Sequence, residues 1–165
     1  MTHLDTPLET PTALDARTTT ALRKMWNAEF PVGIGHADDA SLERYFESLE
    51  NRLHYVVRAR DTQLAGWLAT FDRSEERWFA MIVAREHQRA GLGSQLLRAA
   101  QQENVESLSG WAVDSDRFRR EDGSVYPSPL RFYASHGFIA CPEERFESEV
   151  LSTVRIRWSR GPRRT

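Results

Sequence analysis

A buried strand, a glycine-containing loop and an amphipathic helix follow one another in the middle of the chain, and this order constrains the fold most. Residues 77–83 are nearly all apolar, which predicts a central strand, and residues 93–104 have the apolar spacing of a helix. Residues 108–114 then predict another strand. Two strands joined through a helix run parallel when they pair in one sheet. The chain is therefore predicted to contain a parallel strand pair.

The segments before this unit predict two helices and an antiparallel meander. Leu22, Met25 and Trp26 have helical spacing, which predicts a helix from Asp15 to near Phe30. A second helix is predicted after Asp38 and Asp39, because either aspartate can cap it. The period of apolar residues then changes to two, which predicts strands at residues 53–60, 64–72 and 77–83.

The last third of the chain completes the order α-α-β-β-β-α-β-α-β-β. Ser128 as N-cap and Pro129 as first helical residue predict a short helix that ends at Gly137. Alternating apolar residues predict a final strand at 149–158. The fold class is therefore α/β, with one domain, a mixed and mostly antiparallel sheet, and about four helices. The predicted organisation is an N-terminal arm at 1–13 with room for one short strand, a domain at 14–158 and a basic tail at 159–165.

Composition narrows the class of protein. With 165 residues and a formal net charge of −2, the chain resembles one globular domain and has no overall charge that would attract nucleic acid or an anionic membrane. Cys141 is the only cysteine and His87 has no second ligand at a useful spacing, so no metal is predicted. The sequence has no membrane-length apolar run and no pattern of a signal peptide, which predicts a cytoplasmic protein.

The loop Gln88–Gly93 has the properties of an anion site. It joins a predicted strand to a helix whose first N–H groups lack internal partners and carry the positive end of the helix dipole. Glycines at 91 and 93 remove the Cβ atoms that would keep a phosphate away. The spacing is not that of a dinucleotide-binding fold, and the loop lacks the lysine of a P-loop. A tight turn that only lets the helix pack on the sheet is the alternative interpretation.

Two motifs together resemble the GNAT superfamily of N-acyltransferases. The first is the strand that ends at Val83 and continues into Gln88-x-x-Gly91-x-Gly93, which resembles the coenzyme A loop of that superfamily. The second is residues 130–138, with an aromatic pair on a short helix followed by Gly-Phe. One predicted strand separates the motifs, as in the superfamily, and the similar order of elements covers roughly residues 14–158.

The resemblance implies a function, a cosubstrate and site residues. It implies N-acetyl transfer from acetyl-CoA directly to a primary amine on a small molecule or peptide. The central parallel strands would splay, and main-chain groups of Ile82 and Val83 would pair with the pantetheine arm. Tyr133 matches the tyrosine that often protonates the departing thiolate. The pyrophosphate would be held by main-chain N–H groups in the loop after Gln88, from Arg89, Ala90, Gly91, Leu92, Gly93 and Ser94.

The acceptor side is less determined by the sequence. Asp114 ends a predicted strand, where it would act either as a carboxylate that meets the amine or as the cap of a turn. Glu29 and His36 flank the loop between the first two helices, which in the superfamily often forms a wall of the acceptor site, and they are interpreted as solvated loop residues in preference to that role. A coenzyme-binding module without catalysis is the alternative function, and the sequence leaves open both the acceptor and whether the protein is a homodimer.

Overall fold

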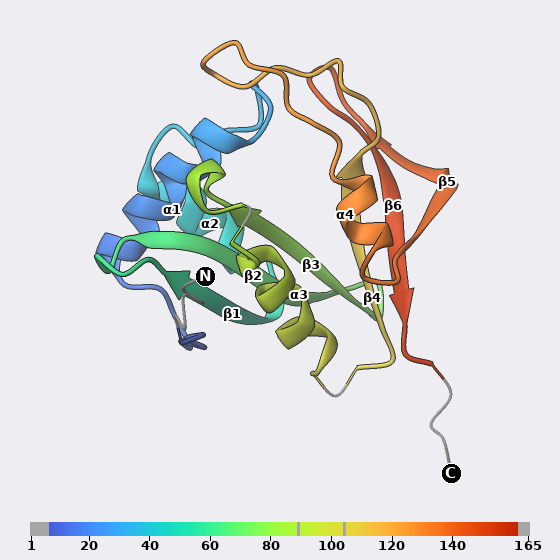
Figure 1. Cartoon of the computed structure of the whole chain (residues 1–165), viewed down its shortest axis with the longest axis horizontal. Helices are drawn as coiled ribbons and strands as arrows, with labels where there is room; N and C mark the ends of the chain where they lie inside the picture. Colours follow the sequence, from blue (N-terminus) through green and yellow to red (C-terminus); the bar gives the residue numbers. More distant parts are fainter. Residues whose placement is uncertain (1–6, 89, 104, 162–165) are drawn as a thin grey trace.

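The computed structural model of the chain describes residues 7–161 except 89 and 104, and its strands form one six-stranded sheet. The strand order is β1-β2-β3-β4-β6-β5, as Figure 1 shows. The strands are β1 Glu50–Arg58, β2 Leu64–Arg73, β3 Glu76–Val83, β4 Ser107–Val113, β5 Ile139–Glu147 and β6 Ser152–Ser159. The helices are α1 Ala16–Glu29, α2 Asp39–Glu47, the 3-10 helix η1 Arg85–His87, α3 Leu92–Gln101 and α4 Leu130–Ala134.

The predicted fold class is confirmed. Every strand pair is antiparallel except β3 with β4, which is parallel and joined through α3. The first two helices begin at the predicted caps, because Asp15 accepts a hydrogen bond from the Thr18 N–H and Asp38 accepts one from the Ser41 N–H. In the described part of the chain, no helix is long and apolar enough to cross a membrane.

Three local predictions differ from the structure. Pro129 occupies the N-cap of α4, and the Ser128 hydroxyl donates to the Val113 carbonyl at 2.6 Å. Ser128 thus ties α4 to the end of β4, a long-range contact that the cap pattern did not contain. In the described part of the N-terminal arm, Glu9 forms one isolated bridge with Val56. The last strand begins at Ser152 because a turn at the preceding residues closes the β5–β6 hairpin.

Helices cover both faces of the first three strands. Alternate side chains of β2 and β3, such as Trp67 and Ile82, pack with α1 and α2, whereas Leu68 and Phe79 pack with α3. The helix α4 lies over the other half of the sheet, beside β4 and β6 (Figure 1). The two halves of the molecule therefore have separate helical covers, with the β3–β4 boundary between them.

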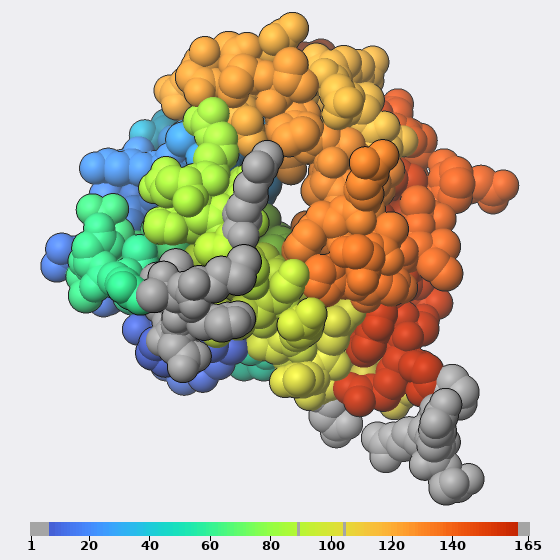
Figure 2. Space-filling model, viewed as in Figure 1, coloured from blue at the N-terminus to red at the C-terminus, as the bar shows by residue number. Residues whose placement is uncertain are grey.

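The boundary between the two halves opens toward one end of the sheet. Trp78 and Ser109, at the beginning of the parallel pair, are its one register pair. Toward Val83 and Val113 the strands separate, and Figure 2 shows a hollow between the β3–α3 connection and the segment that contains α4. Strand twist favours such separation when no ladder hydrogen bonds hold two strands together. The splay that the family resemblance implied is therefore present.

Candidate active site

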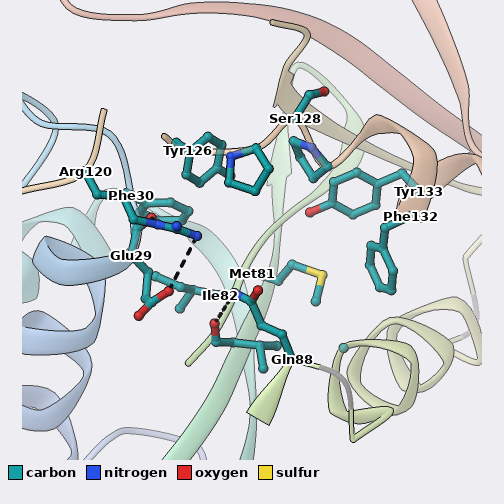
Figure 3. Close-up of a pocket in the computed structure, with 14 residues that line it drawn as sticks. Glu29, Phe30, Met81, Ile82, Gln88, Arg120, Tyr126, Ser128, Phe132 and Tyr133 are labelled. Carbon is teal, nitrogen blue, oxygen red and sulfur yellow. Dashed lines mark hydrogen bonds and ion pairs between the residues drawn. The ribbon is translucent and has the colours of Figure 1, made fainter. Parts of the chain in front are cut away.

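A cavity of about 350 Å³ lies at this divergence of β3 and β4. It contains five of the sequence-predicted site residues, which are Ile82, Val83, Gln88, Gly93 and Tyr133. Its other lining residues are Glu29, Phe30, Met81, Arg120, Tyr126, Pro127, Ser128, Pro129 and Phe132. Figure 3 shows that they come from the end of α1, from β3, from α4 and from the segment before α4.

The phase of the β2–β3 ladder decides which main-chain groups of β3 face the cavity. The Ala84 N–H donates to the Ala65 carbonyl at 3.0 Å. Since hydrogen-bonded pairs alternate along an antiparallel ladder, Ile82 shares its main-chain bonds with Trp67. The main chain of Met81 and Val83 is therefore turned toward the gap beside β4. The Val83 carbonyl accepts a hydrogen bond from the Gln88 side chain at 2.9 Å, which agrees with this phase.

The loop after β3 presents an open helix start. Gly91 is the N-cap of α3 and has a φ of 80°, in the left-handed region that glycine adopts without strain. The first helical hydrogen bond runs from the Gln95 N–H to the Gly91 carbonyl at 3.0 Å. The N–H groups of Leu92, Gly93 and Ser94 are therefore left without an acceptor in the helix. This is the geometry of a main-chain anion site.

The other loop positions differ in what they can offer. The Ala90 N–H already donates to the His87 carbonyl at 3.1 Å, so it closes the local turn. Arg89, which the resemblance included, lies outside the described residues. At Gly93 an added Cβ would lie 3.2 Å from the Phe132 ring, so this glycine also lets α3 approach α4. The helix-packing explanation for the glycines therefore applies to Gly93 and not to Gly91, where an added Cβ would meet no atom within 4 Å.

Tyr133 points its hydroxyl group into the cavity (Figure 3). Its ring is held edge-on against Phe79 and Phe138, with ring centroids 5.6 and 5.7 Å apart. Burial raises the pKa of Tyr133 above its usual value, because the phenolate would lose its hydration. The group is therefore a neutral phenol near pH 7 and can donate a proton or a hydrogen bond.

Glu29 is a buried cavity residue, so its interpretation as a solvated loop residue is wrong. It is the last residue of α1 and its exposure is 7%. One carboxylate oxygen, Oε1, accepts from the Arg85 Nε at 3.2 Å. The other, Oε2, has no hydrogen-bond partner among the described residues. The sequence did hold a signal, because Glu29 follows Met25 by four residues and Trp26 by three and so continues the apolar face of the helix.

The segment from Ser115 to Pro127 forms the roof of the cavity, and it supplies residues that the sequence analysis missed. Arg120 is 8% exposed and donates to two carbonyls, through Nε to Glu29 at 3.1 Å and through Nη1 to Val125 at 3.2 Å. Its guanidinium lies 5.7 Å from the ring of Tyr126. The sequence of this segment shows only that it is polar and charged. Its path depends on contacts with residues that are distant in the sequence, so the sequence analysis did not predict it.

His36 does not line the cavity. Its ring packs against Trp26, with ring centroids 4.9 Å apart, and its Nδ1 lies 2.8 Å from the Ser41 hydroxyl. Partial burial lowers the pKa of His36, which favours the neutral ring. The contacts assign His36 to the packing of the α1–α2 connection.

Asp114 is not among the lining residues of the cavity. Both of its carboxylate oxygens accept hydrogen bonds from Arg145, at 2.8 and 3.0 Å. These hydrogen bonds lower the pKa of Asp114 below its usual value of 3.8, which makes it a poorer proton acceptor. Its role toward the acceptor amine stays a prediction, and the geometry favours a role in joining β4 to β5.

Replacement of Asp114 by asparagine separates the two roles. We expect a loss of less than about 1 kcal/mol in the free energy of unfolding at pH 7, as for a partly exposed ion pair. Because the folded-state pKa of Asp114 is lowered, its stabilisation is present above pH 3.8 and disappears as the pH falls through the folded value. Urea denaturation at several pH values measures this difference. A raised KM for a cationic amine, with an unchanged KM for acetyl-CoA, would instead establish the acceptor role.

Fold and site together define an acyltransferase architecture, in which a parallel pair diverges beside a main-chain anion site and a buried tyrosine. The family model described as "Acetyltransferase (GNAT) domain" matches residues 50–140, more than half of the 165 residues. The chain belongs to the GNAT family of acetyltransferases. The predicted family and enzyme class are thereby confirmed.

Solved structures share the fold at low sequence identity. A protein assigned as a phosphinothricin N-acetyltransferase has a TM-score of 0.70 and 15% identity, covering 94% of this chain and 100% of that chain. A spermidine N-acetyltransferase chimera from Vibrio cholerae and hSSAT has a TM-score of 0.64 and 16% identity, covering 92% and 95%. A GNAT acetyltransferase from Staphylococcus aureus Mu50 has a TM-score of 0.67 and 12% identity, covering 93% and 99%. A comparison with curated proteins finds no match.

Proposed function

We propose that this protein transfers an acetyl group from acetyl-CoA directly to a primary amine bound in the cavity. The observation that carries the proposal is the position of Tyr133 and of the open start of α3 on the same side of one cavity. One supplies a proton donor and the other an anion site, and residues of β3 line the same cavity. The structural neighbours named for phosphinothricin and for spermidine are N-acetyltransferases of amines, which agrees with an amine acceptor.

The residues of the coenzyme side fit a pyrophosphate with an extended arm. Main-chain N–H groups of Leu92, Gly93 and Ser94 would hold the pyrophosphate, because nothing in the helix uses them. The main chain of Val83 and Met81 would pair with the amides of the arm. Ile82, to which the resemblance gave such a pairing, would contribute its side chain to the wall, since its main chain is engaged by Trp67.

Two groups of the chain would act during transfer, one at the thioester oxygen and one at the leaving sulfur. The Val83 N–H would donate to the thioester oxygen as negative charge develops there. The amine nitrogen would form a bond to the carbonyl carbon while the carbon–sulfur bond breaks. Tyr133 would give its proton to the leaving sulfur and recover one from water, a role that its neutral state permits.

Binding and turnover test the proposal separately. Acetyl-CoA should raise the thermal midpoint by mass action, and a free concentration of 100 Kd would add about 2.7 kcal/mol of stability. A panel of primary amines should release free thiol and gain one acetyl group by mass spectrometry. Absence of a thermal shift at millimolar acetyl-CoA would contradict the coenzyme site. A thermal shift without thiol release from any amine would favour the alternative, a coenzyme-binding module without catalysis.

A further inference from the structure

The cavity contains one buried charge of each sign, and these two charges restrict which acceptor can bind. Among its described lining residues the charged side chains are Glu29 and Arg120, and both are more than nine-tenths buried. The lining beside the two charges is aromatic, with Phe30 and Tyr126 next to them (Figure 3). The two charges form an ion pair with each other, and Glu29 also pairs with Arg85, so a ligand in this space meets the polar atoms that these contacts leave without a hydrogen bond.

Glu29 offers a free acceptor atom. Its Oε1 is held by Arg85, while Oε2 is buried and has no hydrogen-bond partner among the described residues. The Arg120 Nη2 lies 3.9 Å from Oε2, which is an ion-pair distance but too long for a hydrogen bond. A carboxylate oxygen in this condition fits an ammonium group, which would supply the missing donor.

Arg120 is held so that part of its guanidinium remains for a ligand. Its Nε and Nη1 donate to the carbonyls of Glu29 and Val125, which fixes the plane of the group. A guanidinium carries five N–H donors, and within the described part of the chain no hydrogen bond is found for Nη2, which has the long contact with Glu29. An anionic group of the ligand can therefore bind at Nη2, next to the site for an ammonium at Oε2.

From this pair of charges we infer that the acceptor is an α-amino acid or a close zwitterionic analogue. Its ammonium group binds Glu29 Oε2 and its anionic group binds Arg120 Nη2. An α-amino acid carries its ammonium group and its carboxylate group on one carbon atom. This short separation matches the 3.9 Å between Glu29 Oε2 and Arg120 Nη2. A polyamine would bring several cations to a single carboxylate, and a simple amine would bring no anionic group to the Arg120 Nη2. The inference rests on the proposed function and names its substrate class.

The charges also define where the protons go. The bound ammonium gives one proton through Glu29 Oε2 to solvent, which frees the nitrogen lone pair for attack on the thioester carbon. The new nitrogen–carbon bond forms, the carbon–sulfur bond breaks, and the sulfur takes a proton from Tyr133. The nitrogen then loses its second proton, which passes through Glu29 and water to the solution. Tyr133 takes a proton back from the solution. The products are an N-acetyl amino acid, free coenzyme A and one released proton.

Matched acceptors test the inference on the unmodified protein. Leucine, leucinamide, 3-methylbutylamine and spermidine share a primary amine and differ in the second group. We expect kcat/KM for leucine to exceed that for leucinamide and for 3-methylbutylamine by on the order of 10²-fold, because neither analogue brings an anionic group to the Arg120 Nη2. Methionine and methioninamide repeat the comparison with another side chain. Spermidine should be the poorest acceptor.

Two variants locate the recognition. Arg120→Lys should lower kcat/KM for leucine about tenfold more than that for leucinamide, because lysine does not reproduce the forked guanidinium. Glu29→Gln should lower kcat/KM for every amine by on the order of 10²-fold with little change in side-chain size. The matched controls are Arg44→Lys and Glu47→Gln, which change exposed side chains of the same types on α2 that do not line the cavity. Both controls should retain the wild-type constants.

The outcomes distinguish this inference from the proposed function. Acetyl-CoA binding with leucinamide or 3-methylbutylamine used as well as leucine overturns the inference, and so does a preference for spermidine. Transfer to none of the amino acids, in a protein that binds acetyl-CoA, also overturns it. In each of these cases the coenzyme site of the proposed function still stands. Absence of any thermal shift with acetyl-CoA overturns both, and the wild-type comparison remains decisive if a variant fails to fold.

Discussion

Replacing Tyr133 by phenylalanine is expected to lower kcat by on the order of 10²-fold, while the affinity for acetyl-CoA barely changes. The substitution removes the Tyr133 hydroxyl group, which points into the cavity, and keeps the ring against Phe79 and Phe138. The fold and the wall of the cavity therefore stay intact, and only the donation of a proton to the leaving sulfur is lost. Steady-state kinetics with a good acceptor, together with acetyl-CoA thermal shifts, measure the two effects separately.

Tyr45→Phe is the matched control, because Tyr45 is a partly buried tyrosine on α2 that does not line the cavity. It should leave kcat unchanged. Burial raises the pKa of Tyr133 above its usual value of 10, so the phenol remains protonated throughout the working range. The wild-type kcat should therefore not fall between about pH 8 and 9.5. A kcat for Tyr133→Phe within about threefold of wild type would mean that water or another group protonates the sulfur.

Gly91→Val is expected to abolish the stabilisation by acetyl-CoA. The φ of 80° at Gly91 belongs to the left-handed region, in which a β-branched residue is strained, so the open start of α3 would be distorted. If the backbone kept its conformation, the valine side chain would project into open space, because no atom lies within 4 Å of a Cβ added at Gly91. The pyrophosphate would approach the helix through this space. Isothermal titration and thermal shifts with acetyl-CoA measure the loss.

Gly123→Val controls for the backbone strain itself. Gly123 has a φ of 84° and equally open surroundings, but it lies in the roof segment away from the coenzyme loop. The two variants should lose a similar free energy of unfolding, of about 1–2 kcal/mol for a left-handed residue. Gly123→Val should keep the acetyl-CoA shift, whereas Gly91→Val should not. Equal retention of the shift in both variants would show that the pyrophosphate does not lie at the start of α3.

The elements of this protein were largely predictable because their signals are local. The apolar spacing of Leu22, Met25 and Trp26 and the cap at Asp15 determine α1 within a few turns of chain. The run of apolar residues before the glycine loop determines β3, and the apolar spacing after the loop determines α3. Together they determine the parallel crossover to β4. The sequence predicted the helix from about Gly93, and the structure places its N-cap two residues earlier, at Gly91, where glycine permits the left-handed φ.

The acceptor side required the tertiary structure, because its residues are distant in sequence and meet only after the sheet has formed. Glu29 and Arg120 are 91 positions apart, and the contact between them depends on the path of the roof segment over the end of α1. Asp114 and Arg145 likewise meet only through the pairing of β4, β6 and β5. Short-range periodicity and capping thus determined the helices, the strands and the coenzyme loop. Long-range packing decided which charged groups lie in the cavity, because burial and pairing of a charge depend on every segment that surrounds it.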